Sequence, residues 1–489
     1  MAAPAASALP AAAATLQATA LAAGACHGCA LRFAGIRDGA SYLRPAAAEG
    51  AVCAVCLGVL QAAAGGGDVW WAAQLVGELD GSGYACRGRA LNVSVTTPAS
   101  MLVRDRLMSI HLKRQGHALA VAPVPVKEAA RAAVETLVRE TLGSTSEQAS
   151  SLSVLIGWQA ADDMGAVLRS GSGEPPPKRQ RDRHQWGAKR KPRGPPPQAS
   201  TAATVKLLVQ LGDEKVATFC ECPPLLAERC TLSPLQLDQK SVFVAGVYCK
   251  YQRGLPQSPW FVGGACTEED GERIGEGSLE ELIQADLCPM FRAALDHRFS
   301  SGGREDKDVR MLGEGRPFLF EIRNARAPAP SEQALLAAEQ AINAHAAGRI
   351  KVSGLRLVTK EHTDFLRSCE DTKRKHYRCV IWTRRPIAAD DARLRALGEL
   401  KDLTVQQMTP VRVLHRRTAA VRPRTIHELR VDRVNEHVLL LDMVTQAGTY
   451  VKEFVHGDLG RSTPSLGSLL GSEVDIVQLD VLAIEYAAE

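Results

Sequence analysis

The 489-residue sequence lacks any uninterrupted run of about eighteen strongly apolar residues, the length that a membrane-spanning helix needs. It also lacks an N-terminal basic segment followed by a Leu-rich core, which is the pattern of a secretory signal. Neither sign of charge dominates, because 59 Lys and Arg residues face 54 Asp and Glu residues, a formal net charge of +5. We therefore expect a soluble intracellular protein without a membrane partner, and its total charge is a weak indicator of any nucleic-acid partner.

The first 22 residues are rich in alanine and contain no charged residue. Organelle presequences usually carry arginine on one face, and this segment has none. We therefore expect residues 1–22 to form a disordered tail, with a mitochondrial or plastid presequence as the alternative.

Thirteen cysteines, an odd number in a chain without a secretory signal, favour a reducing compartment over a disulfide framework. Four of them form two Cys-x-x-Cys pairs, Cys26 with Cys29 and Cys53 with Cys56. Two such pairs can offer four thiolates to one tetrahedral Zn²⁺, which would fold a segment too small to build its own core. The pattern predicts a structural zinc element over residues 23–60, and the alternative is two unrelated reduced pairs. Four cysteine ligands leave no open position for catalysis by the metal.

Residues 61–235 alternate between strand-like and helix-like patterns. Residues 91–95 have the period of two of a strand, Pro125 opens a helical pattern that Gly143 ends, and residues 152–158 form another strand-like run. These patterns predict a mixed α/β module.

Composition changes sharply within this module, over residues 171–203. Two Pro-Pro-Pro runs begin at Pro175 and Pro195, and two basic clusters begin at Lys178 and Lys189. We expect a disordered linker, because so polar a stretch offers too little apolar surface to offset the entropy of ordering. The paired basic clusters resemble a bipartite nuclear-import signal, and the alternatives are a solvated spacer or a non-specific RNA-binding arm.

Residues 236–489 contain many short segments rich in β-branched and aromatic residues and few long helical patterns. The clearest helix begins after Ser331, a candidate N-cap, and ends at Gly348. This region is therefore predicted to be an α+β domain with a large mixed, mainly antiparallel sheet. The predicted strands are residues 242–248, 317–322, 350–358, 377–383, 411–415, 437–444 and 477–484.

The densest chemical signal is Gly303-Arg-Glu-Asp-Lys-Asp-Val-Arg-Met-Leu-Gly313, which we place in a loop before the strand at residue 317. Three acidic and three basic residues alternate within seven of its positions. From composition alone, a solvated and mutually paired loop is the expected interpretation.

Two further segments favour a functional site instead. Tyr377 stands at the mouth of an apolar strand, and residues 448–461 have a strand-like alternation that would place Tyr450 and Lys452 on one side. The basic segment 411–417 could line the path of an RNA backbone or equally form a solvated face, and we assign it no role in the site.

These segments resemble known motifs. Gly448-Thr-Tyr-Val-Lys452 resembles the Gly-Thr-Tyr-Ile-Arg motif of TruB-type pseudouridine synthases, and Arg304-Glu-Asp306 resembles the Arg-Thr-Asp of TruA-type enzymes. Residues 236–489 as a whole are similar to the archaeal and eukaryotic "Pus ten" tRNA pseudouridine synthases, as are the cysteine pairs. Further matching stretches are Gly246-Val-Tyr-Cys-Lys250, Leu255-Pro-Gln-Ser-Pro-Trp260 and Thr409-Pro-Val-Arg-Val-Leu-His-Arg-Arg417.

The resemblance implies a pseudouridine synthase catalytic domain over residues 236–489, preceded by a zinc-containing, THUMP-like α/β accessory domain that binds RNA. It implies that Asp306 is the catalytic nucleophile, with Asp308 as the rival. Lys452 takes the place of the TruB-type arginine and would keep the nucleophile ionised. Its single ammonium cannot reproduce the bidentate fork of an arginine.

The remaining site residues follow from the same resemblance. Tyr450 and Tyr377 are the candidates for stacking on a uracil turned out of the folded RNA, and an ordinary core tyrosine is the alternative for each. Arg304 and Arg310 would either grip flanking phosphates or hold the loop.

As a whole, the resemblance implies isomerisation of uridine to pseudouridine at tRNA T-loop positions 54 and 55, without a guide RNA. We expect structural Zn²⁺, no organic cofactor, tRNA and other structured RNA as partners, a monomer, and a location in the nucleus and cytoplasm. Two rivals remain: an adaptor that binds structured RNA such as microRNA precursors without catalysis, and a zinc-dependent nuclear DNA-binding protein.

Overall fold

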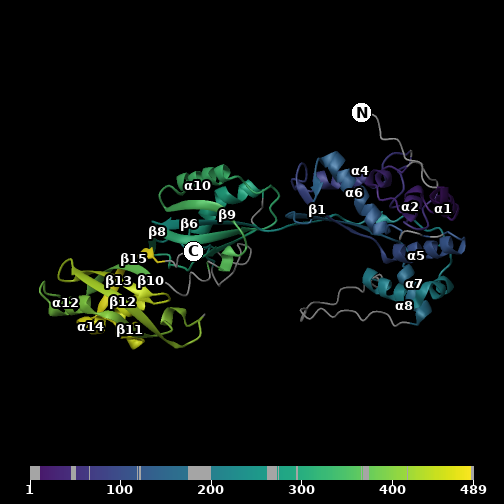
Figure 1. Cartoon of the computed structure of the whole chain (residues 1–489). Coiled ribbons are helices and arrows are strands. Elements are labelled where there is room, and N and C mark those ends of the chain that lie inside the picture. Colours follow the sequence, from purple (N-terminus) through teal and green to yellow (C-terminus); the bar gives the residue numbers. More distant parts are fainter. Residues whose placement is uncertain are drawn as a thin grey trace. The chain divides into compact units, whose positions relative to one another are not determined.

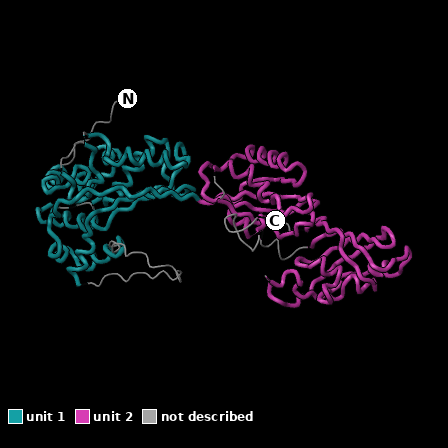
Figure 2. The backbone as a smooth tube through the Cα atoms, turned by 180° about the vertical axis from the view of Figure 1, so that it is seen from behind, with its two compact units in different colours: residues 1–239 teal, residues 240–489 magenta. Residues whose placement is uncertain are grey.

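The computed structural model describes residues 11–45, 51–64, 66–117, 119, 123–173, 200–261, 273, 275–292, 296–364, 366, 374–415 and 417–485. The chain divides into two units, Met1–Gln239 and Lys240–Glu489 (Figure 2). Within the described ranges, each helix is too short or too polar to cross a bilayer.

Unit 1 is an α/β module with a small mixed sheet. Its strands are β1 (Ala90–Thr96), β2 (Thr145–Ser146), β3 (Leu152–Gln159), β4 (Thr231–Leu232) and β5 (Gln236–Gln239). The order is β2-β1-β3-β4, with β5 also on β3; β1 runs parallel to β2 and β3, whereas β4 and β5 are antiparallel to β3. Its helices are α1 (Ala11–Ala22), α2 (His27–Phe33), α3 (Gly39–Leu43), α4 (Ala72–Gly81), α5 (Ala99–Arg114), α6 (Val126–Leu142), α7 (Met164–Ser172) and α8 (Thr201–Phe219).

The expected disordered tail is wrong for its second half, because Ala11–Ala22 form helix α1. Alanine has the highest helix propensity, and Leu16 and Ala20 add their side chains to the core of unit 1. Of the expected linker, residues 174–199 lie outside the described ranges, and its two ends belong to α7 and α8.

Unit 2 is built on one ten-stranded sheet, of order β14-β11-β12-β13-β10-β15-β8-β6-β9, with β7 on β8 (Figure 1). Every pairing is antiparallel except that of β8 with β15, so the prediction of a large mixed sheet in an α+β unit is confirmed. The strands are β6 (Val242–Lys250), β7 (His297–Ser301), β8 (Arg310–Ile322), β9 (Ile350–Val358), β10 (Arg374–Thr383), β11 (Lys401–Met408), β12 (Val421–Arg433), β13 (Val438–Gln446), β14 (Ser462–Thr463) and β15 (Val474–Ile484).

Helices pack against this sheet and contribute side chains to its core. They are α9 (Leu279–Leu287), α10 (Glu332–Ala346), α12 (Ala392–Glu399), α13 (Val451–His456) and α14 (Leu466–Leu470), with 3-10 turns η2 (Cys288–Phe291), η3 (Val411–Val413) and η4 (Asp458–Gly460). Phe318 and Phe320 on β8, Phe291 of η2 and Phe454 of α13 are fully buried in one core cluster.

Two short elements differ from the prediction. The segment predicted as a strand over 411–415 is the 3-10 turn η3, which starts directly after Pro410. Residues 451–456 form helix α13, in which Val451, Phe454 and Val455 are buried at helical spacing. An apolar run this short fits the period of a helix and the period of a strand equally well, so the sequence pattern cannot distinguish them.

The parallel pair of β8 and β15 joins the two halves of the sheet, with Arg310 opposite Asp480 and Met311 opposite Val481. Strand β8 begins at Arg310 and not at residue 317, so the loop before it ends earlier than predicted. The acidic and basic run of the sequence therefore lies at the entrance to this parallel seam.

Candidate active site

The loop between β7 and β8 carries Asp306 and is closed by short backbone bonds. Gly302 donates to the Pro317 carbonyl at 2.9 Å, and Val309 donates to the Asp306 carbonyl at 3.1 Å. Gly303 has φ +104°, and a Cβ there would lie 2.7 Å from Arg316 Nη1. This turn therefore requires glycine.

A buried polar cluster, which we call the floor, lies under the loop. Glu305 is at its centre, in contact with Tyr248 and Arg316, and Gln257 contacts Tyr248. The Glu305 side chain is 1% exposed and accepts hydrogen bonds from Tyr248 Oη (3.0 and 3.1 Å) and from Arg316 Nε (2.9 Å). Gln257 Nε2 donates to Tyr248 Oη at 2.7 Å and to the Gly303 carbonyl at 3.3 Å. Burial, followed by the charge of Glu305, raises the pKa of Tyr248 well above its usual value, which keeps its hydroxyl a donor.

Lys250 joins this floor to the backbone of the loop. Its Nζ is fully buried, lies 3.8 Å from Glu305 Oε1, and donates to the carbonyls of Leu255 and Asp306 at 3.0 Å each. Burial lowers the pKa of Lys250, and the nearby carboxylates act in the opposite direction. The main chain at position 306 is thus fixed from below by a side chain of β6.

The carboxylate of Asp306 lies above that floor, with its side chain 40% exposed. Its Oδ2 is 3.2 Å from Lys452 Nζ and 3.4 Å from Arg412 Nη1. Asp308, 58% exposed, accepts from the same Lys452 Nζ at 2.8 and 3.1 Å. Although burial acts to raise the pKa of Asp308, the hydrogen bond and charge of Lys452 leave it lowered. Lys452 is therefore shared by the two aspartates.

Helix α13 supplies Lys452, and not a strand as predicted. Tyr450 is the N-cap residue of this helix, so Tyr450 and Lys452 are not alternate residues of a pleat. The buried side chain of Gln407 fixes the turn, because it accepts from Tyr450 N and donates to the Tyr450 carbonyl, both at 2.9 Å. Asp306 and Lys452 are nonetheless brought together, since Lys452 Nζ lies 3.2 Å from Asp306 Oδ2. Tyr450 is at the start of the same helix as Lys452.

Arg412 and Glu453 also lie at Asp306, and neither was predicted as a site residue. Arg412 lies on η3, donates from Nε to Glu453 Oε1 at 2.7 Å, and reaches Asp306 through Nη1. Glu453 neighbours Lys452 on α13 and its side chain is 4% exposed. No local pattern joins residues 41 positions apart, although Arg412 lies in a stretch that carried the family resemblance.

The other predicted site residues are placed as follows. Tyr377 on β10 is partly buried, and burial raises its pKa to about 12. The charge of Arg316 acts in the opposite direction. Arg304 is exposed.

Arg310 is the first residue of β8 and belongs to a structural ion cluster. It donates to both oxygens of Asp480 at 3.0 and 2.5 Å, and Arg253 donates to the same carboxylate at 2.5 Å. The two alternatives for Arg310 were contact with a phosphate and holding the loop. This geometry favours a structural role, because Arg310 ties the end of the loop to β15.

The four predicted zinc ligands of unit 1 form one buried cluster. Their sulfur atoms all lie within 4.8 Å of one another, with Cys26 Sγ 3.6 Å from Cys56 Sγ and Cys53 Sγ 3.8 Å from Cys29 Sγ. Four thiolates around one Zn²⁺ at about 2.3 Å would be about 3.8 Å apart, so the donor set and its spacing fit the metal.

Backbone amides support these sulfur atoms, as around a metal-bound thiolate. Cys56 N donates to Cys53 Sγ at 3.4 Å, and Cys29 N donates to Cys26 Sγ at 3.4 Å. The buried Arg32 donates from Nε to Cys29 Sγ at 3.5 Å and from Nη1 to the Val124 carbonyl at 3.0 Å, and it pairs with Asp105 of α5. The cluster is thereby connected to the rest of unit 1.

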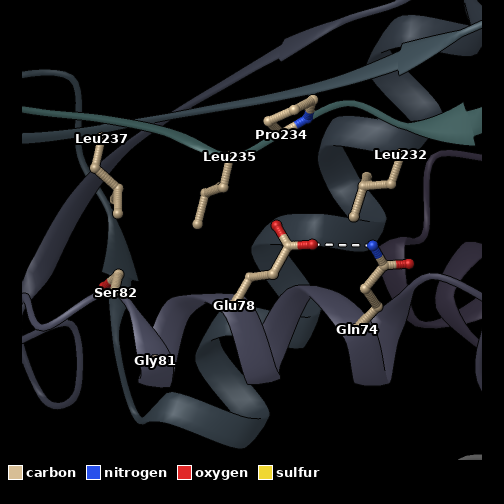
Figure 3. A pocket seen from close by; sticks show the side chains of 8 residues that line it. All are labelled: Gln74, Glu78, Gly81, Ser82, Leu232, Pro234, Leu235 and Leu237. Carbon is tan, nitrogen blue, oxygen red and sulfur yellow. Dashed lines mark hydrogen bonds between the residues drawn. The ribbon is translucent and has the colours of Figure 1, made fainter.

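A pocket of about 600 Å³ also lies in unit 1, between α4 and the β4–β5 segment (Figure 3). Its one carboxylate, that of Glu78, accepts a hydrogen bond from Gln74 at 2.9 Å, and leucine side chains form the opposite wall. None of its described lining residues is a nucleophile paired with a base or a cation, so the Asp306 loop of unit 2 is the better candidate for chemistry.

Two family models match this chain, one in each of its two units. The family model "Pus10, C-terminal" matches residues 243–485, and "Eukaryotic Pus10, N-terminal" matches residues 53–236. A solved Cbf5-Nop10-Gar1 complex aligns with a TM-score of 0.26 at 12% identity, over 49% of this chain and 60% of that one, a likeness too low to carry an argument.

The similar proteins include three vertebrate tRNA pseudouridine synthases named Pus10. The mouse protein is 36% identical over 446 residues (89% of this chain, 78% of the mouse protein), and the Xenopus laevis protein is 34% identical over 445 residues (89% and 80%). The human protein is 42% identical over 284 residues (58% and 52%). Similarity at this level, over most of both chains, shows that the chain belongs to the Pus10 family of tRNA pseudouridine synthases.

Proposed function

We propose that this chain isomerises uridine to pseudouridine in the T-loop of tRNA, at position 54, position 55 or both, and that Asp306 is its nucleophile. The observation that carries the proposal is the surroundings of Asp306. Its backbone is fixed by buried Lys250, while its partly exposed carboxylate is within 3.4 Å of two cations. A carboxylate so held is paired with cations, oriented and accessible to RNA.

The chemistry requires one transient bond. An oxygen of Asp306 bonds to C1′ of the ribose as the C1′–N1 bond breaks, and uracil leaves with the electron pair. After the base turns, C5 bonds to C1′ and the carboxylate leaves with its own pair; C5 loses a proton and N1 gains one. Atoms and charge balance without an oxidant or an activated donor, so we propose that no organic cofactor takes part.

Lys452 stabilises the charge of the carboxylate before the attack and after its release. Tyr450 and Tyr377 are proposed to stack on the turned-out uracil, each contributing about 1–3 kcal/mol against a cost of a few kcal/mol for turning the base out. Arg304, which is exposed, is proposed to contact a phosphate, whereas Arg310 holds the strands.

Unit 1 is proposed to be the accessory module, with the THUMP-like character and the RNA-binding role that the resemblance implies. Cys26, Cys29, Cys53 and Cys56 would hold structural Zn²⁺, which supplies folding energy and no chemistry because four thiolates fill its coordination sphere. We further propose a monomer in the nucleus and cytoplasm, which gel filtration and cell fractionation would test.

The test uses the purified full-length protein and an unmodified tRNA transcript, without guide RNA, with chemical mapping of pseudouridine. Asp306→Asn should lower the rate at least about 1,000-fold because the nucleophile is lost. Asp308→Asn is the matched control, and its exposed ion pair should be worth no more than about 10-fold.

Full activity of Asp306→Asn, or loss only in Asp308→Asn, would reject Asp306 as nucleophile. Tight tRNA binding by wild-type protein without any pseudouridine would favour the adaptor. Mapping also shows which of the two T-loop positions is modified.

A further inference from the structure

We infer that Arg412 is a second catalytic cation, acting on the Asp306 carboxylate, and that Glu453 is the positioning residue that holds it there. The inference rests on Asp306 being the nucleophile. It adds to the site two residues outside the nucleophile and Gly-Thr-Tyr-Val-Lys motifs.

The position of Arg412 is determined by its backbone as well as by its side chain. Val411 donates its N–H to Asp458 Oδ2 at 3.2 Å, and Arg461 Nη2 donates to the Thr409 carbonyl at 2.7 Å, so η3 is held on both sides of Pro410. The guanidinium is then divided between Glu453 Oε1, through Nε, and Asp306 Oδ2, through Nη1.

Glu453 is a buried carboxylate, and among the residues that the structure describes its one ion pair is with Arg412. Its Oε2 is buried and has no hydrogen-bond partner within the described part of the chain. An isolated buried charge is costly, so the contact with Arg412 is strongly favoured. Although burial opposes the charged form of Arg412, its hydrogen bond and charge pairing with Glu453 leave its pKa raised. Arg412 is therefore a permanently charged group with little freedom to turn away.

The two cations on Asp306 have the same kind of support. Lys452 has a second carboxylate in Asp308, and Arg412 has a second carboxylate in Glu453. When Asp306 bonds to C1′ it loses its negative charge, and each cation then keeps one carboxylate partner. Neither cation is left uncompensated while the ester exists, and both are in place when the carboxylate leaves. The two cations are therefore already in position to stabilise the negative charge of Asp306, which is lost when the ester forms and restored when the ester breaks.

The test is single-turnover pseudouridine formation by the full-length protein on an unmodified tRNA transcript, with the Kd for tRNA and the thermal unfolding midpoint measured in parallel. The variants are Glu453→Gln, Arg412→Met, their double variant and Arg412→Lys. Glu453→Gln keeps the shape of the side chain and removes the charge.

We expect Arg412→Met and Glu453→Gln each to slow the reaction by about 10-fold to 1,000-fold, with Kd within about twofold of wild type. The double variant should be no slower than Arg412→Met alone, because Glu453 acts through Arg412. Arg412→Lys should recover part of the rate, since one ammonium can approach Asp306 but cannot also hold Glu453 as the fork does.

Wild-type rates in Arg412→Met would overturn the inference, as would a raised Kd with an unchanged rate, which marks a phosphate contact. Losses that multiply in the double variant would overturn the positioning role of Glu453. If Glu453→Gln does not fold, the exposed Arg412 variants still decide the role of the cation. Asp306→Asn separates the two proposals: its full activity rejects the nucleophile, whereas an inactive Asp306→Asn beside a fully active Arg412→Met rejects only this inference.

Discussion

Three acidic residues within four positions of one loop have three different surroundings. Glu305 is buried and fully paired, Asp306 is half-exposed between two cations, and Asp308 is exposed beside Lys452. Composition alone makes all three equal candidates for the nucleophile, and the family resemblance singled out Asp306. The structure distinguishes the three residues, because it gives Asp306 both a fixed backbone and an accessible carboxylate.

Asp480 provides a test of structure at the same scale. Burial acts to raise its pKa, but the hydrogen bonds and charges of Arg310 and Arg253 leave it lowered. A carboxyl whose pKa is lower in the folded state stabilises the fold above its unfolded pKa of about 3.9, and this contribution is lost as the pH falls through the folded value.

We therefore expect Asp480→Asn to lower the free energy of unfolding by about 1–3 kcal/mol at pH 7, as for a charged hydrogen bond. The difference from wild type should shrink as the pH falls below 3.9. Urea unfolding at several pH values measures both. Asp432→Asn, which removes an exposed pair with Arg430, is the control and should change stability by no more than about 1 kcal/mol. An equal effect of both variants, or one independent of pH, would contradict the assignment of Arg310 as a structural cation.

At the scale of the element, the parallel seam between β8 and β15 depends on close backbone approach. Gly313 has φ +63°, and a Cβ there would lie 2.1 Å from the Leu482 carbonyl oxygen. That neighbour is backbone of β15 and cannot turn aside.

Gly313→Ala should therefore destabilise unit 2 by about 1–3 kcal/mol beyond the strain of a positive φ. Gly354→Ala is the matched control, because Gly354 has φ +66° with open space around its Cβ position, so it reports the backbone strain alone, about 1–2 kcal/mol. Chemical unfolding of both variants measures the difference. Equal losses would mean that the seam can open to accept a methyl group.

The strands that were predicted correctly are those with sustained patterns, such as β1, β3, β6, β9 and β13. The two segments assigned to the wrong type are short, because η3 and α13 each occupy six residues or fewer, too few to distinguish a helical period from that of a strand. Strands β7, β11 and β12 were not predicted. Helix α1 was missed because its pattern is featureless, and its order comes from tertiary burial of Leu16 and Ala20.

The candidate site was predicted as far as motifs carried it. Asp306 and Lys452 came from two recognisable segments, and the structure brings their charged groups to 3.2 Å. Arg412, Glu453 and Lys250 make contacts between segments that are far apart in the sequence. Such contacts are set by the tertiary structure, which one sequence does not reveal.

At the scale of the whole molecule, the two largest core clusters of the described residues are separate, one in unit 1 that includes the four cysteines and one in unit 2. If the four cysteines hold Zn²⁺, the metal belongs to the stability of the first core alone.

Metal analysis should find one zinc per chain, and a strong chelator should lower the thermal unfolding midpoint of unit 1 while the core of unit 2 keeps its protection. Hydrogen exchange followed by mass spectrometry separates the two, since peptides from α2 and residues 53–60 should lose protection and peptides from β10 and β13 should not. Cys56→Ser should reproduce the effect of the chelator. Unchanged protection around the cysteines after zinc removal would reject a structural metal there.

The floor beneath the nucleophile has a consequence for engineering. Residues 303–313 form one continuous segment that could be transferred to another protein. Their conformation, however, depends on Tyr248 and Lys250 of β6 and on Arg316 further along β8. If the segment were grafted into another protein without those three side chains, it would keep its sequence but would not adopt the same conformation. A transplant of this catalytic loop would have to include the two strands below it.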